Sequence, residues 1–534
     1  MKILGLNIGW RDATPPPPPP APTPAQPPEP GAAGNRSARR RRGRVGPRSR
    51  VWDAGETTNL SFDWLTTPTT SDQDLFRKLR PLRARSREQV ANNPYARKFM
   101  GMLRTNVVGP QGLRLQVRSK SDATNEAIEE AWLQWGKSKA CDVEGKRTWR
   151  QMQELCLTTM AQDGEFILRK RRGPRWGRWG FALQFLDPEL LDIQKNAVLE
   201  NGHIVRMGVE MDEFRRPVAY WFLDPRERLD GAISYYARDH IRVAAEEIIH
   251  GFMHERVGQT RGVPWLATVL IRLRMLGRYE EAALVAARIG ASKMGFITTE
   301  TGDGYKGDDE DADGAVIQDV EPGTFEQLPA GTSVTAYNPD YPHGEFAQFN
   351  SALLQGISSG LLVSYPSLSS NLGGVNYSSI RAGLLEERDQ WRLVQGLLGS
   401  ECSDPAYQAW LEMQLLTGTI AVAGTPLSLR DEEEYRYRST WGGRRWEWVD
   451  PQKEIAAAEK AVQNRFKSRS QVIRDMGQDD PADVFAEIAK EEQLLAELGI
   501  PPVPATPSKP KVEDPPDEDG EDQDNEDAGE KESE

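Results

Sequence analysis

The chain has 534 residues, of which 38 % are hydrophobic and 37 are proline, and its formal net charge is −13. This length allows about three or four average domains, while the low hydrophobic share and the many prolines indicate segments without a core. Its cysteines form neither a CxxC pair nor an even set (Cys141, Cys156 and Cys402). A secreted disulfide framework and a cysteine-rich zinc module are therefore excluded, and a reducing intracellular origin is favoured.

The charge is concentrated at the two ends of the chain. Residues 512–534 carry 13 acidic and 1 basic side chain, whereas residues 1–50 carry 10 basic and 2 acidic ones. The part between them, residues 51–511, has a net charge of −9. The composition of the acidic end, residues 501–534, predicts disorder.

The first 50 residues predict a disordered arm. Residues 13–30 contain eleven prolines, which fix φ and remove backbone donors, so we expect an extended spacer. The arginines that follow can bind phosphates by counterion release, although a solvated basic tail is the alternative; the candidate residues are Arg39, Arg40, Arg41, Arg42 and Arg44. The first ten residues lack the apolar run of a signal peptide, and no stretch reaches the 18 apolar residues of a membrane span.

The next part of the chain predicts a mixture of helices and strands. Asn93 before Pro94 is typical of a helix cap followed by proline in the first turn, and Gly109-Pro110 ends that helix. Ile128, Ala131, Trp132 and Trp135 share one face of a helix predicted over 121–135. Alternating segments bounded by turn residues predict strands at 113–118, 165–170, 181–186, 203–211 and 217–223.

Long helices dominate the second half. An apolar stripe from Pro264 to Lys293 predicts a helix of about 45 Å, at about 1.5 Å per residue, which indicates an elongated protein. A second helix is predicted over 345–364, weakened by two glycines, and a third begins near Ser379. The polar segment 365–379 between them is predicted to be a loop. Residues 450–499 are predicted to be helical, with a capping-box spacing at Ser468 and Gln471.

Two segments carry residues that can bind metals. His250 and His254 have the i, i+4 spacing of zinc ligands, but Gly251 stands where a metalloprotease needs glutamate. Residues 308–321 have a calcium-loop spacing at Asp309, Asp311, Asp313 and Gly314, yet Val320 takes the place of the bidentate glutamate. A hydrated acidic loop is the favoured interpretation of the second segment, and no metal site is expected in either.

No other motif predicts catalysis. The glycines of LGGVNYSS lack the lysine of a phosphate-binding loop, and the chain has no GxSxG motif. Several of the fifteen tryptophans follow arginine, as in Arg175-Trp176, Arg178-Trp179 and Arg445-Trp446. Such pairs can stack on bases, but core positions are the commoner explanation. These patterns together predict an elongated, assembling protein of mixed helix and strand with no visible active site.

Taken in order, five segments resemble portal proteins of tailed bacteriophages, of the lambda type. They are NNPYARKFMGMLRTNVVGPQG (92–112), QDGEFILR (162–169), EEIIHGFMHERVGQTRGVPWLATVL (246–270), SYPSLSSNLGGVNYSSIRAGLLEERDQW (364–391) and WEWVDPQKEIAAAEKAVQNRFKSRSQVIRDMGQD (446–479). The resemblance implies an α+β portal fold assembled as a ring of twelve subunits at one capsid vertex, through which DNA is packaged and ejected.

The resemblance also divides the chain into regions. It implies a disordered arm (1–50), a wing (51–263), two stem helices (264–293 and 345–363), a clip with the acidic loop (294–344), a tunnel loop (364–378), a long helix returning through the wing (379–445), a helical crown (446–500) and a disordered tail (501–534). The residues of the tunnel loop expected to face DNA are Tyr365, Ser367, Ser369, Ser370, Asn371, Gly373, Gly374, Asn376 and Tyr377.

The implied partners are the other ring subunits, the large terminase subunit, major capsid and scaffold proteins, head–tail connector proteins and double-stranded DNA, without a membrane. The implied protein is structural, needs no cofactor, is made in the bacterial cytoplasm and ends in the virion. A net charge near −9 for residues 51–511 suits a channel wall that lets DNA slide. The alternatives are a nucleic-acid-binding protein acting through its arginine arm and a metal-dependent hydrolase using His250, His254 and the acidic loop.

Overall fold

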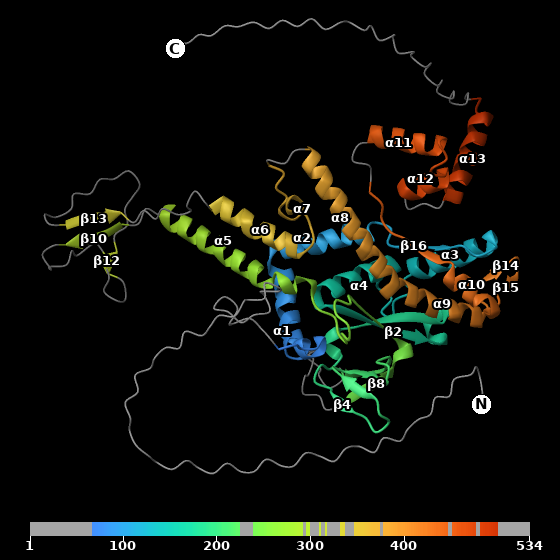
Figure 1. Cartoon of the computed structure of the whole chain (residues 1–534), viewed down its shortest axis with the longest axis horizontal. Coiled ribbons are helices and arrows are strands. Elements are labelled where there is room, and N and C mark those ends of the chain that lie inside the picture. The colour runs from blue at the N-terminus through green and yellow to red at the C-terminus, as the bar shows by residue number, and fades with distance from the viewer. Residues whose placement is uncertain are drawn as a thin grey trace, which may run out of the picture. The chain divides into compact units, whose positions relative to one another are not determined.

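The computed structural model describes ten stretches of the chain: 67–224, 239–291, 295–299, 309–310, 316–317, 332–336, 346–373, 377–446, 451–476 and 481–499. The chain divides into two units, Met1–Pro68 and Thr69–Glu534, and every element below belongs to the second. The arginine arm and the acidic tail lie outside the described stretches. Within them helices and strands are mixed, and every pairing of strands is antiparallel (Figure 1).

The described part begins with two consecutive helices, α1 (Ser71–Asn92) and α2 (Pro94–Leu103). A capping box at Thr70 starts α1. The carboxamide oxygen of Asn93 accepts hydrogen bonds from the backbone nitrogens of Tyr95 (3.0 Å) and Ala96 (3.2 Å), which confirms the predicted cap. A π-helical turn, η2 (Arg104–Val108), follows α2, and Gly109 ends it at a φ of 65°.

Aromatic side chains fill the core between α3 (Asp122–Lys137), α4 (Trp149–Asp163) and α9 (Asp404–Thr417). The Trp132 ring lies 4.7 Å from Trp135 and 5.1 Å from Trp410, measured between ring centroids. Trp179, one of the tryptophans that follow arginine, is buried against Trp410 with Arg178 over its ring. Trp179 therefore occupies a core position, as the sequence favoured, whereas Trp176 and Trp446 are only partly buried.

Two antiparallel sheets stand beside this core. The first has the order β3-β2-β9 and consists of β2 (Glu165–Arg172), β3 (Phe181–Leu186) and β9 (Ile248–Phe252). The second has five strands in chain order: β4 (Ala197–Val198), β5 (Ile204–Arg206), β6 (Val209–Met211), β7 (Pro217–Leu223) and β8 (His240–Ala244). The single strand predicted over 203–211 is wrong, because Met207 and Gly208 have φ values of 46° and 84° and fold it into a hairpin.

Two long helices, α5 (Leu270–Ala291) and α6 (Phe346–Gly360), pack side by side (Figure 1). The α-helix begins six residues later than predicted because Trp265–Thr268 forms a 3₁₀ turn, so α5 measures about 33 Å at about 1.5 Å per residue. A Cβ atom on Gly360 would lie 2.5 Å from the side chain of Val269. The glycines that weaken α6 as a helix therefore allow it to approach the start of α5 closely.

Two short antiparallel strand pairs lie between α5 and α6 in the chain. Strand β10 (Gly295–Thr299) pairs with β13 (Thr332–Ala336), and β11 (Asp309–Glu310) pairs with β12 (Val316–Ile317). Of the candidate calcium-loop positions, Asp309 lies in β11, whereas Asp311, Asp313 and Gly314 lie outside the described residues.

After α6 the chain continues through α8 (Tyr377–Leu398), the π-helical turn η8 (Gly399–Ser403) and α9. The elements that follow are β14 (Ala421–Val422), β15 (Thr425–Pro426), α10 (Glu432–Tyr437), β16 (Ser439–Gly442), α11 (Pro451–Gln463), α12 (Arg469–Met476) and α13 (Pro481–Glu497). The strand predicted at 113–118 is present as β1 (Arg114–Val117), and it pairs with β16. The Ser468 hydroxyl accepts a hydrogen bond from the backbone nitrogen of Gln471 at 3.1 Å, which is one of the two bonds of the predicted capping box. None of the helices searched in the described stretches is long and apolar enough to cross a membrane.

Candidate functional site

The segment predicted to be the tunnel loop is partly helical. Tyr365–Ser369 forms the short helix α7, with Pro366 in its first turn, so the prediction of a loop is wrong for these five residues. Proline suits this position because its fixed φ is helical and its missing N–H has no helical partner there. Leu368 is buried, and α7 contacts both α2 and α6. The first half of the predicted loop is thus part of the packed structure.

A buried carboxylate anchors the start of α7. Glu387 on α8 accepts hydrogen bonds from the backbone nitrogen of Ser364 (3.2 Å) and from its hydroxyl (2.7 Å). The indole nitrogen of Trp391 donates to the same carboxylate at 3.3 Å. Hydrogen bonds to a charged acceptor are stronger than neutral ones, so this contact ties Ser364 firmly to α8.

The end of α7 is held by weaker, more exposed contacts. Ser370 has a φ of 59° and accepts a hydrogen bond from Lys98 at 2.7 Å. The side chain of Asn371 accepts from the backbone nitrogen of Gly373 at 2.9 Å and donates to the Tyr365 hydroxyl at 3.4 Å. Residues 371–373 are exposed. The exposed part of the predicted loop therefore starts at about Ser370 rather than Tyr365.

The remaining residues of the predicted loop divide between α7, α8 and the part of the chain outside the described residues. Ser367 bonds to the Ser364 hydroxyl at 2.8 Å, and the Ser369 hydroxyl donates to the carbonyl of Tyr365. Gly374 and Asn376 lie outside the described residues, and Tyr377 is the first residue of α8. The candidate arm residues Arg39, Arg40, Arg41, Arg42 and Arg44 also lie outside them.

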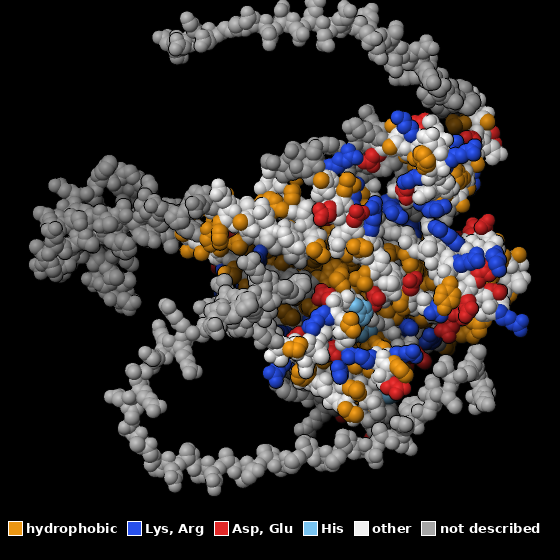
Figure 2. Space-filling model, in the orientation of Figure 1, with side chains coloured by type: hydrophobic (Ala, Val, Ile, Leu, Met, Phe, Trp, Pro, Cys, Tyr) orange, Lys and Arg blue, Asp and Glu red, His pale blue; other side chains and the backbone are white. Residues whose placement is uncertain are grey.

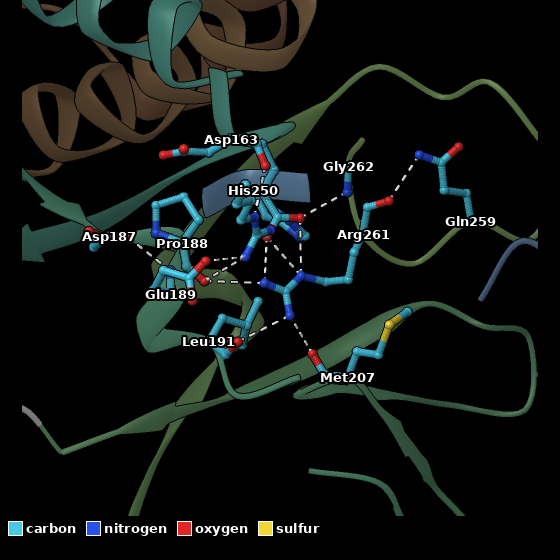
Figure 3. Close-up of polar contacts among 12 residues, drawn as sticks. Asp163, Asp187, Pro188, Glu189, Leu191, Met207, His250, Gln259, Arg261 and Gly262 are labelled. Carbon is cyan, nitrogen blue, oxygen red and sulfur yellow. Dashed lines mark hydrogen bonds and ion pairs between the residues drawn. The ribbon is translucent and has the colours of Figure 1, made fainter. Parts of the chain in front are cut away.

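A cluster of charged residues that the sequence did not indicate is buried between α1 and the two sheets (Figure 3). Glu165 on β2 accepts hydrogen bonds from the guanidinium groups of Arg83 (2.5 Å) and Arg261 (2.8 Å). It also accepts from the backbone nitrogen of Gly262 at 2.9 Å and pairs with the ring of His250 at 3.0 Å. The three charged side chains are completely buried. We call Arg83, Glu165, His250 and Arg261 the buried charge cluster.

Backbone carbonyls complete the bonding of the two buried arginines. Arg261 donates to the carbonyls of Leu191 (3.1 Å) and Met207 (2.6 Å), toward which its side chain points in Figure 3. Arg83 donates to the carbonyl of Asp163 at 2.8 Å. The cluster thus joins α1, both sheets and the loop before α5, and it leaves neither guanidinium without acceptors.

The charges of the cluster fix its protonation. Burial alone would raise the pKa of Glu165, but the charges of Arg261 and Arg83 hold this pKa well below its usual range. Burial lowers the pKa of His250, which favours the neutral ring. Burial also lowers the pKa of Arg261, yet a guanidinium starts so high that it stays charged. Two cations therefore share the Glu165 carboxylate, and Arg83 also pairs with the buried Glu189 at 3.6 Å, as in a structural ion network rather than a catalytic pair.

The two candidate zinc ligands are engaged elsewhere. His250 belongs to the buried charge cluster, and its ring packs 4.9 Å from Phe252. The ring of His254 lies 4.2 Å from the ring of Phe252, so Phe252 separates the two imidazoles. Across the stretches that the structure describes, no three His, Cys, Asp or Glu side chains form a group that could hold a metal. The hydrolase hypothesis therefore finds no support there.

The geometry describes a protein of mixed helix and strand whose charged interior is structural and whose polar residues 370–373 are exposed. Residues 57–395 match the model of the phage portal protein family, lambda family. The chain belongs to the lambda family of phage portal proteins. Because the match begins at residue 57, the arginine arm lies outside it, and the nucleic-acid-binding alternative is not favoured.

Individual relatives agree. The chain is 32 % identical over 466 residues to the probable portal protein of Halomonas phage phiHAP-1, covering 85 % of this chain and 88 % of the relative. It is 23 % identical to portal protein B of Escherichia phage lambda, covering 78 % of this chain and 84 % of that protein. The portal protein of Escherichia phage N15 is 22 % identical, with 78 % and 85 % covered.

Among solved structures, chains from gene transfer agent particles match this chain with low TM-scores. A chain from the neck of a native particle computed with C12 symmetry has a TM-score of 0.38 and 12 % identity, covering 75 % of this chain and 94 % of its own. A chain from the neck of an empty particle computed with C6 symmetry has a TM-score of 0.41 and 13 % identity, covering 83 % and 98 %.

Proposed function

We propose that copies of this chain close into a ring, twelve in the assembled capsid, around a channel for double-stranded DNA at one vertex of the virion. Membership of the portal family is the observation that carries the proposal. The protein acts structurally, and the ATP hydrolysis that drives packaging belongs to the large terminase subunit. It is made in the bacterial cytoplasm, where capsid and scaffold proteins meet it, and head–tail connector proteins bind it after packaging.

The two faces of α5 support self-association. On one face Leu273, Leu276 and Ala283 are buried against the rest of the subunit. On the opposite face Ile271 and Met275 are 73 % and 62 % exposed, and Val285 follows on the same side. Figure 2 shows apolar side chains gathered over the α5–α6 pair. Arg278 is exposed between Met275 and Val285, so this face is mixed rather than apolar. A neighbouring subunit of the ring would cover its apolar side chains.

The regions of the portal are assigned on this basis. We assign α5 and α6 to the stem, β10 to β13 to the clip that meets terminase and the connector proteins, and α11 to α13 to the crown. The tunnel loop shortens to residues 370–376, because α7 is anchored to α8 through Ser364. Residues 71–263 would form the wing, to which α8 and α9 return.

The distribution of charge refines the expectation of a slippery wall. The net charge of −9 does not extend to the stem, since α5 carries four arginines and two glutamates and α6 carries no charge. Arg274 and Arg278 are exposed on α5. If α5 lines the channel, its arginines are expected to attract phosphates, so the acidic character that lets DNA slide must come from other segments.

Electron microscopy of the purified full-length protein tests the proposal. Rings with a central hole are expected, and monomers or fibres at every concentration would contradict it. The double substitution Ile271→Glu and Met275→Glu is expected to reduce the fraction of rings while the far-ultraviolet circular dichroism stays unchanged. Val257→Glu is the control, because Val257 is an apolar residue that is fully exposed and lies in a turn outside α5. An equal effect of both variants would refute the role of α5.

A further inference from the structure

Two cysteines far apart in the chain meet inside the protein. The Sγ atom of Cys156, on α4, lies 3.3 Å from the Sγ atom of Cys402, in the π-helical turn η8. Both residues are completely buried and both are free thiols. The third cysteine, Cys141, contacts the backbone carbonyls of Gly136 and Arg147 instead of another thiol. The pair is therefore specific to α4 and η8.

We propose that Cys156 and Cys402 are a site of oxidative cross-linking, at which a peroxide oxidant converts the two thiols into a disulfide between α4 and η8. A disulfide needs the two sulfurs about 2.05 Å apart, so the closing movement is on the order of 1 Å. Cys402 lies in a π-helical turn, whose wider backbone interrupts the regular helix between α8 and α9.

The chemistry is balanced by the oxidant. One thiol sulfur attacks a peroxide oxygen and breaks the O–O bond, giving a sulfenic acid and water. The second thiol then attacks the sulfenic sulfur, the S–S bond forms, the S–O bond breaks, and the hydroxide leaves as water with the remaining proton. The two sulfurs lose two electrons, which reduce the peroxide. Burial raises the pKa of Cys156 and disfavours its thiolate, so the reaction is slow and follows local opening.

If the protein is part of a virus particle, as the proposed function has it, the particle's surroundings would favour the disulfide. The subunit would fold with reduced thiols in the cytoplasm and meet oxidising conditions after release, where disulfides persist. The link would close a loop of 246 residues, and a cross-link over a long loop restricts the unfolded chain strongly. The mature particle would thus gain a covalent connection that the assembling subunit lacks.

The experiment treats the reduced, folded full-length protein with hydrogen peroxide and maps its peptides without reduction. Wild type and the control Cys141→Ala are expected to yield one cross-linked peptide containing Cys156 and Cys402, and each protein loses two thiols. The thermal unfolding midpoint should rise by a few degrees and return with a dithiol reductant. Cys402→Ala should show neither change.

Three results would overturn the proposal, provided that circular dichroism shows the protein still folded: Cys156 remains a free thiol, it proceeds to a sulfinic acid, or the cross-linked peptides contain Cys141. Because these measurements need no ring, they separate failure of this site from failure of the proposed function.

Discussion

Glu165 and Arg261 are 96 residues apart in the chain, yet they are joined by hydrogen bonds of 2.8 and 3.0 Å, and neither side chain reaches solvent. A buried ion pair of this kind contributes little net stability over an apolar pair of the same shape. Its removal on one side is costly, however, because the remaining charge stays buried without a partner. The pair therefore matters more for which structure forms than for how stable it is.

The first prediction concerns this pair. Glu165→Gln keeps the size of the side chain but removes the carboxylate that Arg83 and Arg261 share, leaving Arg83 only the more distant Glu189 at 3.6 Å. The free energy of unfolding should therefore fall by about 3–5 kcal/mol. Urea denaturation measures it. Glu247→Gln is the control, since the Arg169–Glu247 pair is partly exposed and should contribute less than about 1 kcal/mol. Equal, small losses would contradict the importance of burial.

A second prediction concerns pH. Hydrogen bonds from Arg242, together with those from His203 and Trp221, lower the pKa of Glu210 to about 2. The folded pKa lies below the ordinary value of about 4.3, so this stabilisation is full above that value and is lost as the pH falls toward 2. It should amount to about 1–2 kcal/mol at neutral pH, because the partly exposed Arg242 is screened by solvent.

Urea denaturation of wild type and Glu210→Gln across pH 6 to roughly pH 2 checks this directly. The difference in unfolding free energy between the two proteins should shrink steadily toward acid. A difference that is independent of pH would mean that the contacts of Glu210 do not depend on its charge.

The third prediction concerns two glycines in close contact. A Cβ on Gly262 would lie 2.0 Å from the carbonyl oxygen of Gly164. Gly164 is the residue that ends α4, at a φ of 94°. Because backbone atoms must move, Gly262→Ala should destabilise the protein by about 2–3 kcal/mol in a denaturation experiment. Gly396→Ala is the matched control: it lies within α8 with nothing within 4 Å, and should stabilise the protein by up to about 1 kcal/mol.

The fourth prediction concerns the anchor of α7. Glu387→Ala removes the acceptor of both Ser364 hydrogen bonds and leaves buried donors unsatisfied, at a cost of about 1–3 kcal/mol. Hydrogen exchange at the Ser364 amide should then accelerate about tenfold, since about 1.4 kcal/mol corresponds to that factor. Glu386→Ala, at the exposed neighbouring position, should leave the exchange rate unchanged. Unchanged exchange in Glu387→Ala would show that packing alone holds α7.

The fifth prediction separates the two halves of the predicted loop. Replacing residues 371–376 with a shorter glycine–serine segment should impair DNA packaging into proheads while rings still form. Leu368→Asp should instead impair folding and assembly, because Leu368 is buried. Two measurements distinguish the outcomes: DNA packaging in the presence of terminase, and the number of rings counted in electron micrographs. Equal loss of packaging and of rings in the first variant would contradict the assignment of the tunnel loop.

Local signals in the sequence predicted much of the fold correctly. The Asn93 cap and the helix carrying Trp132 follow from patterns within a few residues. The strand around Leu115 was predicted from its local alternation, although its partner β16 lies far along the chain. The predicted strand 203–211 failed because Met207 adopts a left-handed conformation, which a non-glycine residue seldom signals.

The buried charge cluster could not be predicted in the same way. The arginines Arg83 and Arg261 resemble the many exposed ones until the fold brings them to Glu165 over separations of 82 and 96 residues. His250 had the spacing of a metal ligand, but spacing cannot reveal that a carboxylate 85 residues earlier binds its ring. The polar composition of 365–369 likewise did not reveal that Leu368 and Glu387 would hold these residues in a helix.

The order of synthesis gives the buried charge cluster a further consequence. A chain leaves the ribosome from its N-terminus, so Arg83 and Glu165 emerge long before Arg261 and Gly262. Until those later residues are available, the carboxylate lacks half of its partners and the hydrogen bonds of Arg261 to Glu165 and Met207 cannot form. The nascent wing should therefore stay incompletely folded until the chain has passed Gly262, shortly before α5 is made. This region would thus complete its folding just before α5, the helix proposed to join neighbouring subunits, is exposed.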